Sequence, residues 1–145
     1  MAGRKYQKYI VETTHIPESV TKKDAPSTAA GKIKRVIWLD ERVVDGAFFL
    51  NLSWYMKPLG IDNEVGHTHD FDEVLGFIGS DWNNPRELNG EVEFWLEDEK
   101  YILTKSSVIF IPKGIKHCPL KVLRADQPII HFGTGPQRQY IRAGE

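Results

Sequence analysis

Three histidines and one glutamate have the types and spacing of a four-ligand site for a divalent metal. His67 and His69 are one residue apart, Glu73 follows four positions later, and His117 lies much further along the chain. Histidines at i and i+2 share a face only on a β-strand, because strand side chains alternate between faces. A zinc-protease helix would instead need histidines at i and i+4. The spacing therefore predicts a metal-ligand set and the β-structure that presents it.

The donor set restricts the kind of metal. Imidazole nitrogens together with one carboxylate suit first-row transition metals, whereas Mg²⁺ and Ca²⁺ prefer oxygen ligands. We expect iron, and Mn, Ni, Zn, Co and Cu stay open as alternatives. A single carboxylate leaves a divalent centre with a net positive charge, which attracts anionic oxygens and lowers the pKa of bound water.

Most of the chain is a series of short β-runs separated by turns. Alternate residues are apolar in the longest runs, as in half-buried strands, and no stretch has a sustained helical period. Many short strands at this spacing indicate an antiparallel sandwich or small barrel, so we predict an all-β fold. The expected strands cover residues 35–39, 47–56, 74–78, 91–96, 101–104, 108–111, 120–123 and 128–132.

The N-terminal residues 1–32 differ from the rest and are interpreted as an arm. Residues 19–31 are rich in Ser, Thr, Ala, Lys and Pro, a composition typical of irregular segments, and residues 9–11 could form a short strand. Residues 33–145 are expected to form a single domain, because a chain of 145 residues is most simply one domain and shows no internal repeat.

Over residues 46–132 the chain resembles the cupin superfamily, through two sequence motifs. The first cupin motif is Gly, five residues, His-x-His, three or four residues, Glu, six residues and Gly. The second is Gly, five residues, Pro-x-Gly, two residues, His, three residues and Asn. The positions that match directly are His67, His69, Glu73, Pro112, Gly114 and His117.

Four positions of this chain depart from the cupin pattern. Gly60 and Gly79 are each displaced by one residue. Ser106 stands in place of the leading Gly of the second motif, and Lys121 in place of its final Asn. These departures affect turns and a position that is not a ligand. The resemblance therefore still implies a cupin-type jelly-roll β-barrel, assembled as a homodimer, with the metal inside.

His131 and Tyr55 are the candidate catalytic groups outside the ligand set. His131 lies in a late strand and either faces the metal cavity or is a core histidine, since a barrel strand presents only two faces. Tyr55 shares its strand face with Asn51 and Ser53, opposite the apolar set of the same strand. One of the two sets must face inward, and the pattern does not choose between them.

Cys118 and Trp82 allow less specific interpretations. Cys118 follows His117 directly, so regular alternation would place it on the opposite face, as a small buried apolar residue. Trp82 lies in the polar break 80–89, which is either a lid over the pocket or a surface loop.

Composition excludes several classes of partner. The formal net charge is −1 and the basic residues are scattered, so we expect no binding to nucleic acid or to a membrane surface. The first twenty residues lack the apolar core of a signal peptide, and a single cysteine suits a reducing compartment. The expected location is the cytoplasm.

The expected function is metal-dependent chemistry on a small chelating molecule. Three His and one Glu leave two adjacent positions on an octahedral ion, enough for a bidentate enolate, catecholate or hydroxy acid. One branch is a dioxygenase-type oxidoreductase; the other is a metal-assisted isomerase or lyase. The alternative is a non-catalytic cupin that binds or senses a small molecule, because a fold does not establish a reaction.

Overall fold

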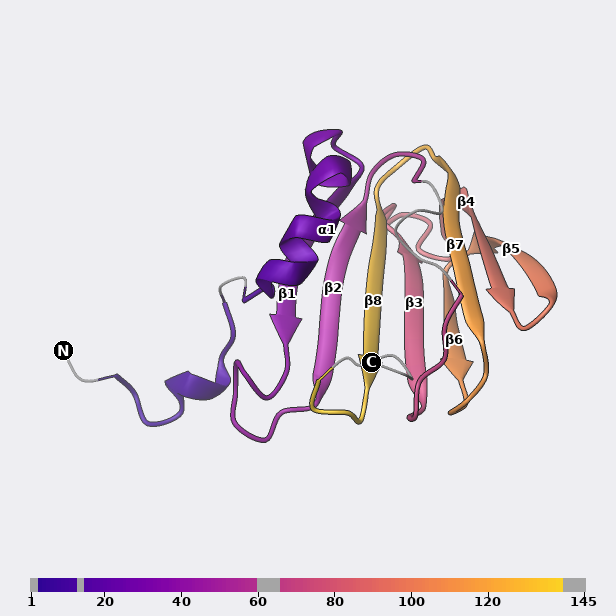
Figure 1. The fold of residues 1–145 in the computed structure, drawn as a ribbon. Coiled ribbons are helices and arrows are strands. Elements are labelled where there is room, and N and C mark those ends of the chain that lie inside the picture. The colour runs from indigo at the N-terminus through magenta and orange to yellow at the C-terminus, as the bar shows by residue number, and fades with distance from the viewer. Residues whose placement is uncertain (1–2, 13–14, 60–65, 140–145) are drawn as a thin grey trace.

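The computed structural model describes residues 3–12, 15–59 and 66–139. Within them, eight strands form two antiparallel sheets that pack face to face (Figure 1). One sheet has the order β1-β2-β8-β3-β6 and the other the order β5-β4-β7. The strands are β1 (Ile33–Leu39), β2 (Phe49–Tyr55), β3 (Glu73–Gly79), β4 (Glu87–Leu96), β5 (Glu99–Lys105), β6 (Ser107–Ile111), β7 (His117–Ala125) and β8 (Ile129–Gly135).

Each of the eight β-runs expected from the sequence corresponds to one of these strands, and the all-β, jelly-roll prediction is confirmed. The largest boundary difference is in β4, which begins at Glu87, inside the segment expected to be a polar break. Glu87 lies opposite Lys105 of β5 and forms an ion pair with it. Cross-strand pairing therefore extends the strand into polar sequence, which alternation of apolar residues does not reveal.

The N-terminal segment contains helix where none was expected. A 3₁₀ turn, η1 (Gln7–Tyr9), replaces the suggested short strand, and α1 (Glu18–Ala29) occupies the stretch expected to be irregular. The residues that α1 buries are polar, Asp24 and Ser27, so the helix has no apolar stripe by which a sequence pattern could identify it. It is held instead by an ion pair between Asp24 and Arg35 of β1.

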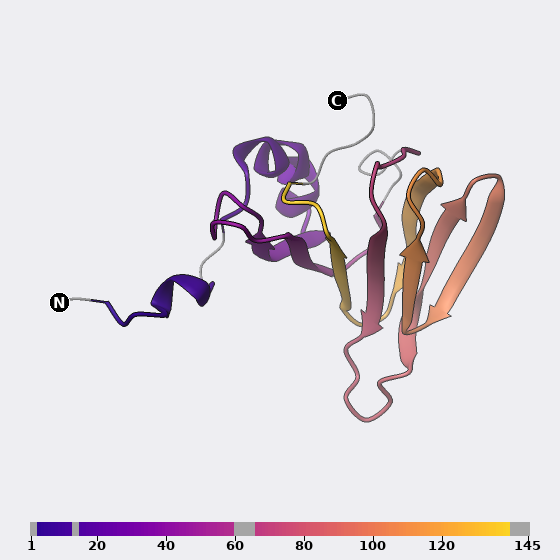
Figure 2. The same ribbon diagram turned by 90° about the horizontal axis from the view of Figure 1, so that it is seen from below.

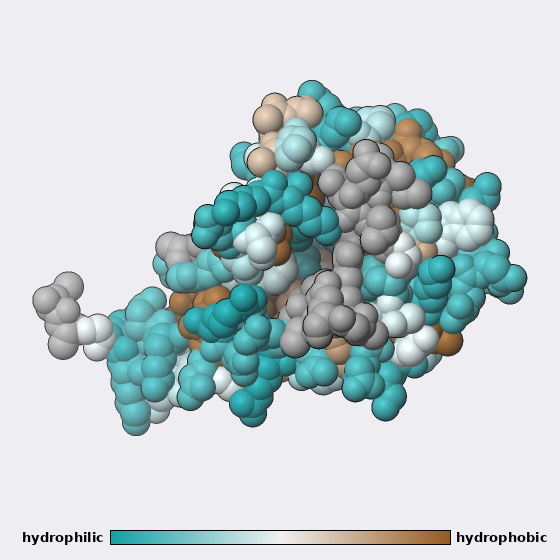
Figure 3. All heavy atoms as spheres, in the orientation of Figure 1, coloured by the Kyte–Doolittle hydropathy of each residue, from teal (hydrophilic) through white to brown (hydrophobic). Residues whose placement is uncertain are grey.

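The position of α1 bears on the site because the helix covers one side of the sheets. It lies along β1, at the end of the five-stranded sheet away from β4, β5 and β7 (Figures 1 and 2). Its outward side is polar, with Lys22 paired to Glu18, and the space-filling view shows mainly hydrophilic atoms there (Figure 3). The segment that carries η1 extends away from the sheets in both ribbon views.

The alternation left open for β2 is resolved. Phe49, Asn51, Ser53 and Tyr55 are buried, whereas the residues between them are only half-buried. The polar set together with Tyr55 therefore faces the interior, and the apolar set Leu50, Leu52 and Trp54 lies on the outer face. The interior of this sheet has polar character along β2, which is unusual for a strand that only fills a core.

A cross-strand row on the inner face carries several of the residues discussed below. Arg35 of β1 lies opposite Ser53 of β2, which lies opposite His131 of β8, which lies opposite Phe77 of β3. Ser53, His131 and Phe77 are buried. Because opposite residues of neighbouring strands point to the same face, the row fixes which side chains meet inside the sandwich.

Apolar side chains from both sheets fill the remaining interior. The five-stranded sheet contributes residues such as Phe77 and Ile129, and the three-stranded sheet Val92, Phe94 and Val122. All five are almost completely removed from solvent. Burial on this scale stabilises the sandwich by about 1.5–3 kcal/mol for each large side chain, so the fold does not depend on a metal alone.

Two departures from the cupin pattern have local structural reasons. A Cβ on Gly79 would come within 1.9 Å of the carbonyl oxygen of Glu87, so only glycine allows β3 to approach β4 here. Ser106 accepts a hydrogen bond from the Gly79 N–H at 2.9 Å and donates one to the Pro85 carbonyl at 2.6 Å. The hydroxyl thus ties the end of β3 to the following loop. Gly60, the first motif glycine, lies outside the described residues.

Among the described residues, no helix has the length and apolar character needed to cross a membrane.

Candidate metal centre

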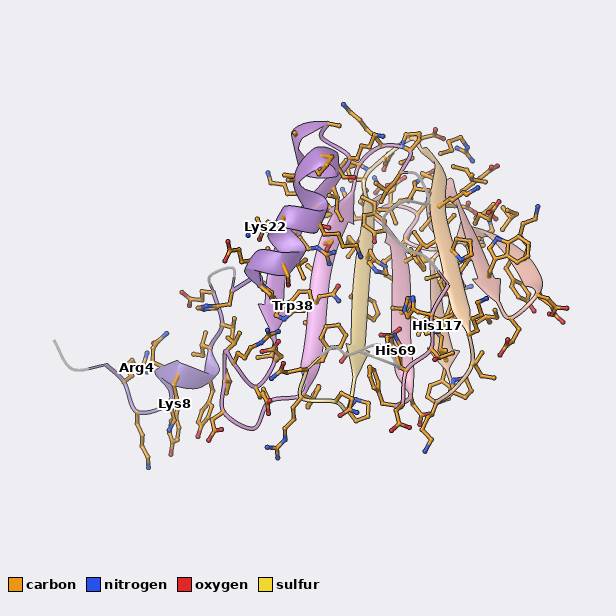
Figure 4. The ribbon with its side chains drawn as sticks, in the orientation of Figure 1. Arg4, Lys8, Lys22, Trp38, His69 and His117 are labelled. Carbon is orange, nitrogen blue, oxygen red and sulfur yellow. The ribbon has the colours of Figure 1, made fainter. Side chains whose placement is uncertain are left out.

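Three histidines converge between the two sheets. His69 and His117 are almost completely buried, with exposed fractions of 2% and 1%, and His67 is half-buried. One ligand nitrogen of each lies within 4.8 Å of those of the others. Figure 4 shows His69 and His117 close together in the space between β3 and β7. The structure therefore brings together the three histidines that the sequence singled out.

Backbone pairing positions the two ends of this cluster. His67 forms an isolated antiparallel bridge with His117, with N–H to carbonyl distances of 3.0 Å in both directions. The expected regular strand at His67 and His69 is thus reduced to one bridge. His69 is placed separately, by a hydrogen bond from Gly114 N–H to its carbonyl and by stacking of its ring on Phe71 at 4.7 Å.

Gly114 belongs to the turn between β6 and β7, where it adopts a φ of 84°. This left-handed conformation is readily available to glycine, which explains the Pro-x-Gly sequence of the turn. The turn is closed by a 3.2 Å hydrogen bond from Ile115 N–H to the Pro112 carbonyl, and β7 begins at His117. The turn therefore delivers His117 to the cluster and anchors the His69 backbone.

Glu73 joins the histidines as the first residue of β3. Its Oε1 lies 3.3 Å from Nε2 of His117, and its Oε2 lies 3.6 Å from Nε2 of His69. The carboxylate is buried, with an exposed fraction of 2%. Three nitrogens and one carboxylate are therefore gathered in one buried place, which is the donor set expected from the sequence.

The protonation geometry of His117 favours coordination. Its Nδ1 lies 3.0 Å from the carbonyl oxygen of Ile115, and because a carbonyl only accepts, Nδ1 carries the proton in the neutral ring. Nε2 then presents its lone pair to the centre of the cluster. A hydrogen bond from the other ring nitrogen is the usual way in which a protein orients a metal-binding histidine.

Within the described part of the chain, Oε2 of Glu73 and Nε2 of His117 are among the buried polar atoms that have no hydrogen bond. A buried carboxylate oxygen or imidazole nitrogen without a partner costs about 1–3 kcal/mol. A divalent cation would satisfy both atoms at once. The residues therefore fit a transition metal, which His67, His69, Glu73 and His117 would hold.

The cluster opens into a cavity with a mixed lining. Besides His67, Glu73 and His117, its walls include apolar and aromatic side chains from both sheets and several polar groups from the α1 side. The members outside the ligand set are Val20, Lys23, Arg35, Trp38, Asn51, Tyr55, Leu75, Cys118, Leu120 and His131. An apolar cavity with a few convergent polar groups is the usual form of a small-molecule site.

His131 faces this cavity and is buried. Its ring stacks between Tyr55 at 4.9 Å and Phe77 at 4.7 Å, and its Nδ1 lies 3.0 Å from the Gly76 carbonyl. Burial, together with the positive charge of Arg35, lowers the pKa of His131 to about 3, although the Gly76 hydrogen bond acts in the opposite direction. The ring is therefore neutral near pH 7, with its proton on Nδ1 and an acceptor nitrogen at Nε2.

Tyr55 and Cys118 also line the cavity. Tyr55 is 2% exposed and reaches the interior because the inward face of β2 is the one that carries it. Cys118 is buried within the core cluster, but with a φ of 72° it interrupts the regular alternation of β7. Cys118 therefore lines the same cavity as His117, whereas regular alternation would place it on the opposite face of the strand.

Arg35 and Lys23 are cavity residues that sequence reasoning missed. Lys23 comes from α1, which was expected to be an irregular arm, and Arg35 begins a run that was considered only as a strand. The one available signal was a charged residue in a run that is otherwise largely apolar. Trp82, the suggested lid residue, is 85% exposed and is not among the residues that line the cavity.

No family profile and no curated protein sequence matches this chain. Solved structures that are similar include KdgF from a Halomonas species, with 19% identity, a TM-score of 0.44, and coverage of 74% of this chain and 79% of that one. Another is an RmlC-like cupin from Shewanella frigidimarina, with 19% identity, a TM-score of 0.45, and coverage of 75% and 80%. An oxalate oxidase in complex with glycolate has 11% identity, a TM-score of 0.47, and coverage of 74% and 52%.

These TM-scores lie below 0.5, so the fold and the site are interpreted from the geometry of the chain itself. That geometry consists of two facing antiparallel sheets, a Pro-x-Gly turn that delivers His117, and a histidine cluster between the sheets. The expected all-β jelly-roll fold is therefore confirmed by the two facing antiparallel sheets.

Proposed function

We propose that this protein is a metal-dependent enzyme that acts on a small chelating organic molecule. The observation that carries the proposal is the buried cluster of three imidazoles and one carboxylate at the wall of a partly polar cavity. A divalent metal bound there would supply Lewis-acid polarisation of substrate oxygens and, if it is iron, activation of O₂. The reaction is then of the dioxygenase type, or a metal-assisted isomerisation or elimination.

The residues around the cluster define what the protein itself contributes. Tyr55 and His131 form a stacked part of the cavity wall, backed by Phe77, which would hold a flat or extended substrate in one orientation. Nε2 of His131 accepts a hydrogen bond from a substrate hydroxyl and does not act as a proton shuttle, because a group with a pKa of about 3 is a poor base near pH 7. Its role in this proposal is orientation.

The weak basicity of His131 is also what supports the second candidate, a non-catalytic protein that binds or senses a small molecule. A site without a base of suitable pKa can retain a ligand at the metal without transforming it. In this alternative the ligand chemistry is unchanged, and only turnover is missing.

The proposal is tested with protein purified without added metal, then loaded with Fe(II), Mn(II) or Ni(II). O₂ uptake and product formation are measured on a panel of catechols, 2-hydroxy acids and 2-oxo acids. Substrate-dependent O₂ consumption selects the dioxygenase branch, and anaerobic turnover selects the isomerase or lyase branch. Tight ligand binding without product under both conditions would refute the enzyme hypothesis and support the non-catalytic binding protein.

We further propose that the protein is a homodimer that acts in the cytoplasm. The outer face of the five-stranded sheet exposes large apolar side chains, with Phe48 56%, Val108 60% and Phe110 60% accessible. Phe48 and Phe110 border the same shallow hollow on that face. Exposed apolar surface of this kind marks protein contacts, and a second copy would cover it. The single buried cysteine supports the reducing location.

A further inference from the structure

Two uncharged polar side chains, Asn51 of β2 and His131 of β8, line the cavity into which the histidine cluster opens. Both are buried, with exposed fractions of 9% and 7%. Asn51 lies opposite Gly133, two residues beyond His131, so the two side chains are diagonal neighbours on the inner face. Backbones in this relation are about 7–8 Å apart, and their side chains can contact the same small group. Asn51 and His131 are called the polar pair below.

The ring of His131 presents an acceptor to the cavity. Tyr55 and Phe77 stack against the ring, and Nδ1 lies 3.0 Å from the carbonyl oxygen of Gly76. The ring edge that carries Nε2 is therefore the part that remains for the cavity. The pKa of His131 is about 3, mainly because of burial, so the ring is neutral near pH 7. Since Nδ1 carries the proton, Nε2 only accepts hydrogen bonds.

The side-chain amide of Asn51 presents a donor beside it. Nη1 of Arg35 lies 3.5 Å from Oδ1 of Asn51, and because a guanidinium only donates, this contact turns the amide oxygen toward Arg35. Nδ2 lies over the backbone of β8, where a Cβ on Gly133 would come within 3.3 Å of it. Glycine at this position thus leaves room for the amide nitrogen. Among the described residues no acceptor engages its N–H groups, which only donate.

The polar pair is separate from the metal ligands on the same inner face. Leu75 lies two residues after Glu73 on β3. It lies opposite Gly133, which in turn lies opposite Asn51. Two strand spacings across the sheet and two residues along it therefore separate the backbones of Glu73 and Asn51, roughly 12 Å. His131 lies opposite the residue four positions after Glu73, which gives a backbone separation of roughly 14 Å. A molecule that chelates the metal must extend along the cavity to reach the polar pair.

An acceptor beside a donor selects the kind of group that binds. A carboxylate only accepts hydrogen bonds and would face the lone pair of Nε2 of His131. An ammonium only donates and would face the N–H groups of Asn51. A hydroxyl both donates and accepts, so a single hydroxyl or two adjacent ones can satisfy both members of the polar pair.

Resting on the proposed function, we propose that the substrate carries an uncharged hydroxyl group remote from its chelating end, and that Asn51 and His131 bind this hydroxyl. Nδ2 of Asn51 donates to the hydroxyl oxygen, and the hydroxyl donates to Nε2 of His131. The near end of the molecule supplies the oxygens that chelate the metal. The substrate class is therefore a 2-hydroxy acid with at least one further hydroxyl along its chain.

Matched acids test the proposal. The acid 2,4-dihydroxybutyrate is compared with 2-hydroxypentanoate, and 2,5-dihydroxypentanoate with 2-hydroxyhexanoate, because each pair keeps the chelating end and replaces the remote hydroxyl with a methyl group. Gluconate is also compared with 2-hydroxyhexanoate, which lacks its further hydroxyls. Malate, 2-hydroxyglutarate and glucarate carry a carboxylate in place of the terminal CH₂OH group of the three hydroxylated acids.

Dissociation constants are measured by calorimetry on Co(II)-loaded protein. We expect at least one hydroxylated acid to bind about tenfold more tightly than its apolar partner, as two net hydrogen bonds would provide. We also expect the carboxylate counterpart of that acid to bind less tightly than the acid itself.

Matched variants separate a binding role from a structural one. Asn51→Leu and His131→Phe remove the polar atoms at similar volume, and each should lower the preference for the hydroxylated acid at least about threefold. Asn51→Ser and His131→Asn retain a polar group and should keep part of the preference, and they also serve if the apolar variants do not fold. Thr134 lies on the same strand as His131 but borders the outer hollow, so Thr134→Val should keep the preference.

The proposal is overturned if no hydroxylated acid binds more tightly than its apolar partner, or if the carboxylate counterpart binds more tightly still. It is also overturned if the preference survives both Asn51→Leu and His131→Phe, or is lost equally in Thr134→Val. Co(II) stoichiometry is measured in the same samples. A protein that binds Co(II) but shows no preference refutes the role of the polar pair and leaves the metal site standing. A protein that does not bind Co(II) refutes the proposed function itself.

Discussion

Nε2 of His117 and Oε1 of Glu73 lie 3.3 Å apart although the two residues begin strands of different sheets, β7 and β3. The proposed ligands thus connect the two halves of the sandwich. A cation that binds this cluster would stabilise the folded chain relative to the unfolded one, because the unfolded chain has no preformed site.

Metal binding should therefore raise the thermal stability of the protein. At a free metal concentration about 100 times the Kd, the expected gain is about 2.7 kcal/mol, which raises Tm by several degrees. Scanning calorimetry of chelator-treated protein, before and after addition of Fe(II) or Co(II), measures the change. The Glu73→Gln variant should show a smaller metal-induced rise in Tm. An equal rise in both proteins would mean that Glu73 is not a metal ligand.

Acidification should weaken the metal-free fold through His131. The pKa of His131 is lowered from 6.5 to about 3 in the folded chain, mainly by burial. The unfolded chain therefore binds more protons between these values, and the stability that His131 contributes is complete above pH 6.5 and is lost as pH falls towards 3. The loss is at most about 1.4 kcal/mol for each pH unit.

Urea unfolding of the unmodified chain and of His131→Asn, at intervals from pH 7.5 to 4.5, isolates this contribution. The free energy of unfolding of the unmodified chain should fall more steeply with acidification than that of the variant. Parallel curves would mean that His131 is not a buried neutral ring.

Removal of the Ser106 hydroxyl should destabilise the protein without affecting the metal. Ser106→Ala loses the hydrogen bonds to the Gly79 N–H and the Pro85 carbonyl, at a cost of about 0.5–1.5 kcal/mol for each bond. Ser107→Ala is the matched control, because the Ser107 hydroxyl donates a local hydrogen bond to the Lys105 carbonyl, two residues away. Chemical denaturation compares the two variants, and an equal loss in both would contradict the bridging role of Ser106.

A charge on the outer face of the five-stranded sheet should dissociate the proposed dimer. Phe110→Lys places a cation in the apolar hollow shared with Phe48, whereas Leu123→Lys changes a comparably apolar residue of the other sheet, 42% exposed. Sedimentation velocity should show a dimer for the unmodified protein and Leu123→Lys, and a monomer for Phe110→Lys. A monomeric unmodified protein would refute the dimer.

The sequence predicts the strands well because their apolar alternation is local. It also predicts which residues gather at the centre, since His67, His69 and Glu73 are close in sequence and a Pro-x-Gly turn precedes His117. The face on which Tyr55 lies could not be read from β2 alone, because either face could be buried. The choice depends on pairing with β1 and β8.

The α1 side of the cavity escaped prediction for a different reason. The buried residues of α1 are Asp24 and Ser27, and polar residues normally indicate a surface. The ion pair with Arg35, eleven positions further along the chain, makes burial of Asp24 favourable. A partner of this kind is a property of the folded chain, so neither the burial of Asp24 nor the place of Arg35 in the cavity wall could be predicted from its own sequence context.

The metal content of single histidine variants tests the central claim most directly. His67→Ala, His69→Ala and His117→Ala are purified in parallel with His15→Ala, whose histidine lies in the exposed N-terminal segment. Bound metal is measured by mass spectrometry and folding by circular dichroism. We predict about one transition metal per chain in the unmodified protein and in His15→Ala, and a loss of most of it in the other three, with the β-fold retained. Full metal occupancy in all three cavity variants would contradict the account.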